Sequence, residues 1–430
     1  MERVEEVVIV GAGICGLATA VALKRYGIEA VVLERAESLR ATGAALTLGS
    51  NAWLALDALG VSHKLHSLYS PLTKYVITNV STGAVQHVPL PRTEGGLGGT
   101  KTMHRKALLE VLAEELTTKN IRFSCKITSI STEDINGSST AILQMEDETI
   151  IKTKVLIGCD GVHSQVARSL GLGEPGGFNG GYVPISDTEL YLFLATGNSA
   201  APGDLDITAK TPPELIQRYV VEHYCKDFPP VYLDVVNHLE LSTLTWASLK
   251  FRLPWDVIFG KLNKGTITVA GDAMHPMTPD LGQGGGCALE DAVVLGRSIG
   301  NTYLKNGNQL LPSEVAQAID DYVKARRWRV TGVITASFLS GWVQDGSSWL
   351  KRLVRDSKIK MVLHAIQKSN HAIVIKTVVY CLWPRSSLWH PFVSSVIFVT
   401  VPPLGFQYLL LVLQSCTQVQ VYSILQDLSY

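Results

Sequence analysis

The feature that most constrains the fold is a glycine motif near the start of the chain. Residues 7–10 form the apolar run Val-Val-Ile-Val, and the pattern Gly-x-Gly-x-x-Gly follows at Gly11, Gly13 and Gly16. An apolar run of this kind predicts a parallel strand that is buried on both faces. Gly11 permits a tight turn, Gly13 lets backbone approach a pyrophosphate, and Gly16 lets the next helix pack against the strand. The motif predicts a Rossmann-type dinucleotide site.

An acidic residue follows at the distance that such a site requires. The helix is expected to end at Gly27, and a second strand over 29–33 leads to Glu34, with seventeen residues between Gly16 and Glu34. A carboxylate in this place accepts hydrogen bonds from the ribose hydroxyls of adenosine and disfavours a 2′-phosphate. The sequence therefore favours FAD or NAD over NADP at this site. The adjacent Arg35 is also predicted to contact the cofactor.

A later motif indicates which dinucleotide binds. The apolar run 266–270 predicts a strand that ends at Gly-Asp and presents Asp272, an acceptor for the ribityl hydroxyls of a flavin. The glycine-rich loop that contains Gly282 and Gly284 then opens a helix. Free N–H groups at that helix start would face the edge of a flavin where negative charge develops on reduction. This arrangement favours FAD.

These motifs resemble those of a known family. The segment 155–161 with Asp160 looks like the Asp-Gly motif of flavoprotein hydroxylases related to p-hydroxybenzoate hydroxylase, the class A flavoprotein monooxygenases. The segment 271–276, continued by Pro279, resembles the Gly-Asp motif of that family. The resemblance covers roughly residues 4–335, and within the family it is strongest to salicylate-hydroxylase-like plant monooxygenases. It implies a parallel-sheet FAD domain and an oxidoreductase activity.

The resemblance also implies a mechanism. NADPH or NADH acts as a transient co-substrate that reduces the flavin, O2 adds to give a C4a-hydroperoxyflavin, and its distal OH is transferred to a small aromatic or apolar substrate. By the same resemblance Arg105 contacts the FAD. No residue is assigned to proton transfer, and His275 is expected to shape the FAD site. A flavin-dependent dehydrogenase or reductase of the same fold is the alternative, and a plain NAD-dependent dehydrogenase would leave two motifs without a role.

Because all three motifs must converge on one ligand, the domains are expected to be interleaved. We predict an α/β fold with a Rossmann-type FAD-binding domain, a smaller mixed-sheet substrate domain and a helical C-terminal part. The predicted FAD domain comprises 1–70, 101–170 and 251–340, the substrate domain 71–100 and 171–250, and an apolar extension 341–430. The family's further substrate strands are missing after Pro175. This gap raises the alternative of a shortened, catalytically impaired isoform.

The composition limits the partners that the protein is expected to bind. The chain has 38 basic and 38 acidic residues, so its net charge gives no reason to expect nucleic-acid binding. Its seven cysteines are scattered and form no Cys-x-x-Cys pair, which predicts reduced thiols, no metal site and an intracellular, most simply cytoplasmic, location. The apolar stretch 391–413 is long enough to cross a bilayer, but Pro402-Pro403 and Gly405 interrupt it. Membrane association is therefore not favoured.

Overall fold

A parallel sheet forms the centre of the computed structural model. The structure describes residues 2–39, 45–78, 85–89, 99–135, 138–173, 181–184, 190–193, 211–225, 230–241, 244 and 250–345. The main sheet has the strand order β13-β14-β10-β1-β2-β7. Its five parallel strands are β1 (Glu2–Val10), β2 (Val31–Leu33), β7 (Ile121–Arg122), β10 (Ile150–Gly158) and β14 (Ile267–Val269), with β13 (Asn263–Lys264) antiparallel at one edge. This confirms the predicted α/β class.

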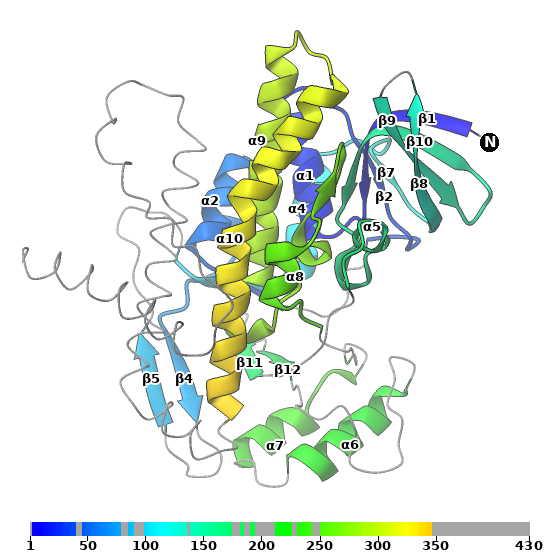
Figure 1. The fold of residues 1–430 in the computed structure, drawn as a ribbon. Coiled ribbons are helices and arrows are strands. Elements are labelled where there is room, and N and C mark those ends of the chain that lie inside the picture. Colours follow the sequence, from blue (N-terminus) through cyan, green and yellow to red (C-terminus); the bar gives the residue numbers. More distant parts are fainter. Residues whose placement is uncertain are drawn as a thin grey trace, which may run out of the picture. The chain divides into compact units, whose positions relative to one another are not determined.

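Strand β10 belongs to two parts of the sheet. Its first half, 150–153, pairs antiparallel with β9 (Ser138–Met145), which pairs with β8 (Ile127–Ile135). Its last residues, 156–158, pair parallel with β14, while β1 runs along the other side of β10 over its whole length. The chain thus carries an antiparallel meander directly into the parallel sheet (Figure 1). Asp160 lies two residues beyond the end of β10.

Two helices pack closely beside the sheet because small residues line their contact. Helix α1 (Ile14–Lys24) lies against α9 (Gly284–Lys305), and α9 in turn lies against α10 (Pro312–Asp345) (Figure 1). A methyl group on Gly296 of α9 would collide with Ala22 of α1, and one on Gly300 would collide with the ring of Tyr26. Helices α9 and α10 confirm the predicted helical C-terminal part.

The remaining elements surround this centre or belong to shorter segments. The helices are α2 (Ser50–Ala58), α3 (Ser62–His66), α4 (Arg105–Glu114), α5 (Gln165–Ser169), α6 (Pro213–Tyr224), α7 (Pro230–Asn237) and α8 (Pro254–Phe259). Three further antiparallel pairs are β3 (Ala45–Leu48) with β6 (Lys101–His104), β4 (Lys74–Thr78) with β5 (Val85–Pro89), and β11 (Gly181–Pro184) with β12 (Leu190–Phe193). The segment predicted to be part of a mixed sheet therefore also contains helices, α6 and α7. The domain boundaries stay a prediction.

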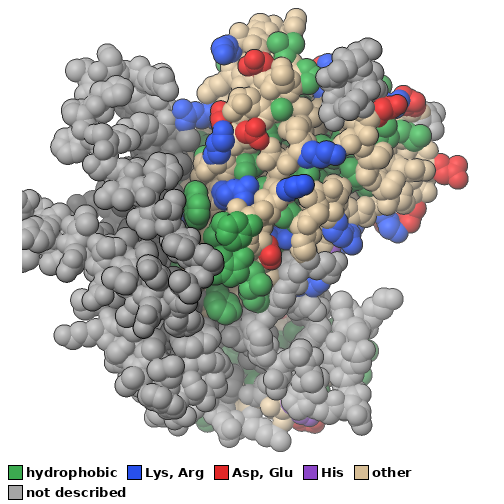
Figure 2. Space-filling model, in the orientation of Figure 1, with side chains coloured by type: hydrophobic (Ala, Val, Ile, Leu, Met, Phe, Trp, Pro, Cys, Tyr) green, Lys and Arg blue, Asp and Glu red, His purple; other side chains and the backbone are tan. Residues whose placement is uncertain are grey.

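The described surface is mixed in charge and carries one apolar area. Basic and acidic side chains alternate over the visible described face, and hydrophobic side chains gather where α8 and α10 lie (Figure 2). Large exposed apolar residues here include Leu253, Trp255 and Phe259 at α8 and Trp328 on α10. Within the described ranges, no helix combines the length and apolar character needed to span a membrane. The apolar stretch 391–413 and the gap after Pro175 lie outside the described residues.

Candidate functional site

The predicted motifs meet at one edge of the sheet. Neighbouring strands β2, β1, β10 and β14 end at the same level, on Leu33, Val10, Gly158 and Val269. Within three residues of these ends follow Glu34, the glycine turn at Gly11, Asp160 and Asp272. Because the carboxyl ends of parallel strands share one edge, the three motifs, which lie far apart in the sequence, are brought to a single line. Ligands of open α/β sheets bind at this edge.

The first glycine motif leaves room at only one of its three glycines. Gly11 has φ +101°, and a methyl group there would lie 2.5 Å from the carbonyl oxygen of Cys159. A methyl group on Gly16 would collide with the carbonyl oxygen of Gly11. At Gly13 no atom lies within 4 Å of such a group. Gly11 and Gly16 are therefore required by the packing of the chain itself, whereas the space beside Gly13 is open to a ligand.

The same turn carries unused hydrogen-bond donors. Helix α1 starts directly after Gly13, with no side-chain cap and no acidic residue in its first turn. The first N–H groups of a helix lack intrahelical partners and carry partial positive charge. An uncapped start next to open space suits an anionic group such as a pyrophosphate.

Glu34 braces the glycine turn from the next strand. Its buried carboxylate accepts hydrogen bonds from the backbone N–H of Ala12 and of Ala36, each at 2.9 Å. A carboxylate has about four acceptor positions, and this one lies at the sheet edge where the ribose of a dinucleotide binds in such folds. The neighbouring Arg35 is exposed at the same edge.

The carboxylate of Asp160 accepts hydrogen bonds from other residues of the protein. One carboxylate oxygen accepts from the hydroxyl of Ser164, and the other accepts from the backbone N–H of Gln165 at 2.6 Å. These contacts fix the start of α5, a role that the sequence did not predict. Burial raises the pKa of Asp160, and the hydrogen bonds from Ser164 and Gln165 oppose that rise.

Asp272 lies in a recess. It is the middle residue of a short 3₁₀ turn, Gly271–Ala273, and its side chain is open to solvent. Among the described residues, none donates a hydrogen bond to its carboxylate. Enough protein surrounds it that burial raises its pKa, and the charges of His275 and Arg105 oppose this rise. The positive charge of Arg105, the half-buried first residue of α4, thus acts on Asp272.

The second glycine loop offers another open helix start. After the short turn Pro279–Leu281, helix α9 begins at Gly284 with no side-chain cap and no acidic residue in its first turn. A methyl group on Gly282 would meet its nearest neighbour at 3.8 Å, and one on Gly284 at 3.9 Å. A methyl group at either position would thus be in ordinary van der Waals contact without a clash, and Gly282 is favoured by its left-handed φ of +59°.

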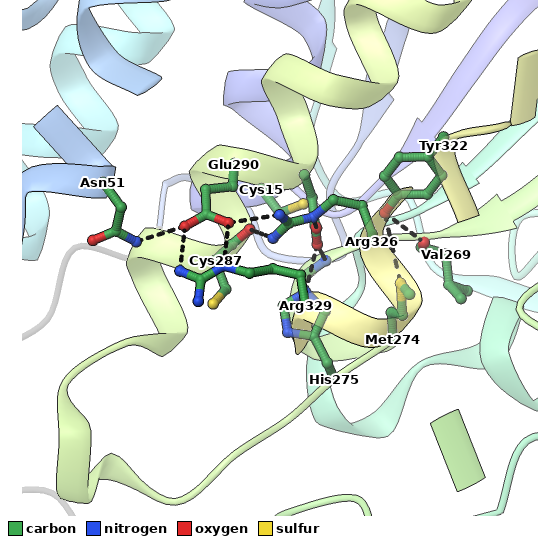
Figure 3. A network of polar contacts seen from close by, with 12 residues as sticks. Cys15, Asn51, Val269, Met274, His275, Cys287, Glu290, Tyr322, Arg326 and Arg329 are labelled. Carbon is green, nitrogen blue, oxygen red and sulfur yellow. Dashed lines mark hydrogen bonds and ion pairs between the residues drawn. The ribbon is translucent and has the colours of Figure 1, made fainter. Parts of the chain in front are cut away.

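The sequence did not predict a buried polar network behind this loop. It joins side chains of α2, α9 and α10 and the turn after β14, and its ionisable members are His275, Glu290, Asp291, Arg326 and Arg329 (Figure 3). Asn51 of α2 donates to Glu290 at 2.7 Å and to Gln283 at 3.1 Å. A signal was present, since two consecutive acids stand in an otherwise apolar stretch of helix, but nothing in it names their partners.

The fold and the strand-edge site define a dinucleotide-binding protein of the flavin type. A family model described as an FAD binding domain matches residues 5–185 and 251–337. Monooxygenase 2 of Arabidopsis thaliana is 34% identical over 405 residues, spanning 85% of this chain and 96% of that protein. The chain belongs to this FAD-binding family, the class A flavoprotein monooxygenases, and is an FAD-dependent monooxygenase.

More distant proteins share the same architecture. The 3-hydroxybenzoate 6-hydroxylase of Polaromonas naphthalenivorans is 27% identical, over 81% of this chain and 90% of that protein. Among solved structures, Klebsiella pneumoniae HpxO complexed with FAD and uric acid superposes with a TM-score of 0.66 at 20% identity, covering 85% of this chain and 97% of that one. At 20% identity, the likeness to HpxO supports the fold alone.

Proposed function

We propose that this monooxygenase hydroxylates a small aromatic or similar apolar molecule, with O2 as oxidant and NADH or NADPH as electron donor. Bound FAD supplies the redox chemistry, namely electron transfer from the pyridine nucleotide and activation of O2. One relative is named for 3-hydroxybenzoate and one structural neighbour holds uric acid. Both molecules are small planar rings; the name of the 3-hydroxybenzoate relative supports this substrate class, whereas the neighbour that holds uric acid supports the fold alone.

The open space beside Gly13 carries the proposal for the cofactor site. It adjoins an uncapped helix start at the carboxyl edge of the sheet, so a pyrophosphate would fit there without displacing protein atoms. We infer that the adenosine side is held by Glu34 and Arg35. The other proposed FAD-binding residues are Gly11, Gly13, Gly16, Arg105, Asp160, Asp272, Pro279, Gly282 and Gly284.

The residues around Asp272 are proposed to bind the ribityl chain and the flavin ring. Asp272 has free acceptor capacity for ribityl hydroxyls, and Arg105 contributes a positive charge to the same recess. The uncapped start of α9 at Gly284 offers free N–H groups, which would stabilise negative charge on a reduced flavin. These groups are fixed by the fold before any ligand binds, which lowers the cost of reorganisation.

His275 is not placed for proton exchange with a substrate. Its ring is fully buried, and Nε2 lies 2.5 Å from a carboxylate oxygen of Asp291. A general base must reach the proton that it removes, directly or through one water. We therefore infer that His275 shapes the FAD site through its contact with Asp291 and does not act as a base.

Three measurements test the proposal. The purified protein should show the absorption bands of oxidised flavin, and Asp272→Ala should lose them while the exposed control Asp321→Ala keeps them. With aromatic acids as probes, substrate should stimulate NAD(P)H oxidation. With ¹⁸O2, the product should carry one labelled oxygen. A flavin-containing protein that oxidises NAD(P)H with these probes but never places label in a product would overturn the proposed reaction in favour of a dehydrogenase or an impaired isoform.

A further inference from the structure

One carboxylate oxygen holds the turn around Asp272 from both sides. Oδ2 of Asp291, on α9, accepts the backbone N–H of Gly271 at 2.8 Å and faces Nε2 of His275 at 2.5 Å. Gly271 directly precedes Asp272, and His275 follows three residues later. Nδ1 of His275 is buried without a hydrogen-bond partner among the described residues, so the interaction with Asp291 sets the orientation of the ring.

The turn cannot easily relax in another way. Gly271 has φ +58°, and a methyl group there would lie 2.8 Å from Cβ of Cys15. The preceding strand end is held by α10, because the hydroxyl of Tyr322 donates to the carbonyl oxygen of Val269 at 3.1 Å. The backbone that carries Asp272 is thus restrained at Gly271 by the nearby Cys15 and at Val269 by Tyr322.

The other oxygen of Asp291 is held by α10. Nε of Arg326 donates to Oδ1 of Asp291 at 2.6 Å, and its NH1 group donates to Glu290 at 2.6 Å (Figure 3). The side chains of Glu290, Asp291 and Arg326 are each at most 2% exposed. Arg326 therefore balances two adjacent buried carboxylates that would otherwise repel each other.

Stability alone is a weak reason for this network. Replacing a buried ion pair with apolar residues of similar volume is often neutral or stabilising, because desolvating the charges costs about as much as their attraction returns. The network instead fixes the orientation of the Asp291 side chain, since each of its oxygens has a defined donor on a different element. The oriented carboxylate in turn holds the backbone of the turn that carries Asp272.

We propose that Asp291, oriented by Arg326, is a positioning residue that fixes Asp272 for its contact with the flavin. This inference rests on the proposed function, in which Asp272 accepts hydrogen bonds from FAD. Asp291 contacts the turn through Gly271 and His275, and its negative charge also contributes to the raised pKa of Asp272. The effect of Asp291 on FAD binding should therefore depend on the carboxylate of Asp272.

A double-mutant cycle on FAD affinity tests this dependence. Apoprotein would be titrated with FAD and followed by flavin fluorescence for wild type, Asp272→Asn, Asp291→Asn and the double variant. Each single variant should raise the FAD dissociation constant on the order of 10- to 100-fold, the range for a hydrogen bond to a charged group. In the Asp272→Asn background, Asp291→Asn should add only a small further increase, because contacting residues are not additive.

Matched variants separate positioning from general damage to the fold. Glu290→Gln changes the neighbouring acid on the same helix and the same Arg326 contact but leaves the turn untouched, so its effect should multiply with that of Asp272→Asn. If Asp291→Asn does not fold, the cycle is run with His275→Ala instead. His275→Gln should partly restore the FAD affinity that His275→Ala loses, because its side-chain amide places a donor near the position of Nε2. Thermal denaturation of each apoprotein reports the fold separately.

The possible failures are distinguishable. An Asp272→Asn variant with unchanged FAD affinity would remove the proposed role of Asp272, and with it this inference. A strong effect of Asp272→Asn combined with a fully multiplicative effect of Asp291→Asn would leave the cofactor site standing and overturn the positioning role alone.

Discussion

The Sγ atoms of Cys15 and Cys159 lie 3.6 Å apart, where the first and second motifs of the site meet. Both thiols are buried and free. The hydrogen bond with Cys159, followed by burial, raises the pKa of Cys15 well above its usual range. Burial raises the pKa of a third thiol, Cys287 at the start of α9, to about 12. These cysteines behave as core residues, in keeping with their scattered positions in the sequence.

We therefore expect strongly unequal thiol reactivity. The thiolate is the reactive form, so a buried thiol with a raised pKa reacts slowly. Burial also raises the pKa of Cys125, but this side chain is only half-buried. In the folded protein an alkylating reagent should modify Cys125 well before Cys15, Cys159 or Cys287, as followed by peptide mass spectrometry. All four should react at similar rates in denaturant, and equal rates in the folded protein would contradict the described packing.

Gly13, which precedes α1, and Gly16, which lies in its first turn, should respond differently to substitution by alanine. Gly13 has φ −80°, which alanine adopts without strain, and its side-chain space is empty. Gly13→Ala should therefore keep the stability of the apoprotein within about 1 kcal/mol, yet weaken FAD binding, because the methyl group occupies the proposed pyrophosphate space.

Gly16→Ala is the matched variant. Its methyl group would collide with the carbonyl oxygen of Gly11, so the unfolding free energy should fall by roughly 1–3 kcal/mol or more whether or not FAD is present. Thermal denaturation of the apoproteins and FAD titration separate the two effects. Normal FAD affinity in Gly13→Ala would place the pyrophosphate elsewhere.

The strand-edge site could be predicted because its signals are local. Each of Glu34, Asp160 and Asp272 follows an apolar strand within a few residues, and parallel strands must end at a common edge. The direction of a side chain at that edge was not predictable in the same way. Asp160 reaches the edge but uses its carboxylate for the start of α5, a choice that depends on the turn formed by the next residues.

The buried network escaped prediction because its contacts are distant in sequence. Glu290 and Arg326 are 36 residues apart, and Asn51 is 239 residues from Glu290. Periodicity places Glu290 and Arg326 on helices but cannot say that the buried faces of those helices meet. The helices α6 and α7 were missed for a different reason. In α6 the apolar residues Ile216, Tyr219 and Val220 follow helical spacing, so the prediction of a sheet for this segment overlooked a local signal.

Acid should weaken the network through Asp291. Burial alone would raise its pKa, but the charges of His275 and Arg326 and the hydrogen bonds from His275 and Gly271 hold it at about 2. The folded-state pKa thus lies below the unfolded value of about 3.9. The resulting stability is fully present above about pH 4 and is lost as the pH falls toward 2, which amounts to roughly 2–3 kcal/mol.

Denaturant unfolding on both sides of this window measures the effect. Between about pH 5 and about pH 3, wild type should lose more unfolding free energy than Asp291→Asn, because the variant has no proton to gain at this position. The exposed Asp321→Asn serves as control, since surface ion pairs contribute little. Identical pH dependence in wild type and Asp291→Asn would show that Asp291 is not held as a charged group.

FAD affinity should also depend on pH, through Asp272 and in a higher range. Burial raises the pKa of this carboxyl group above its ordinary value of 3.8, and His275 and Arg105 only partly offset the rise. A neutral carboxyl group offers fewer acceptor positions to ribityl hydroxyls than a carboxylate does. The FAD dissociation constant should therefore rise as the pH falls through the raised pKa, by up to about tenfold per pH unit below it. Fluorescence titrations from neutral pH downward would show this rise in wild type and a nearly flat profile in Asp272→Asn, which cannot change its charge. The same slope in both proteins would mean that another group controls the pH dependence and that Asp272 does not contact the flavin as a carboxylate.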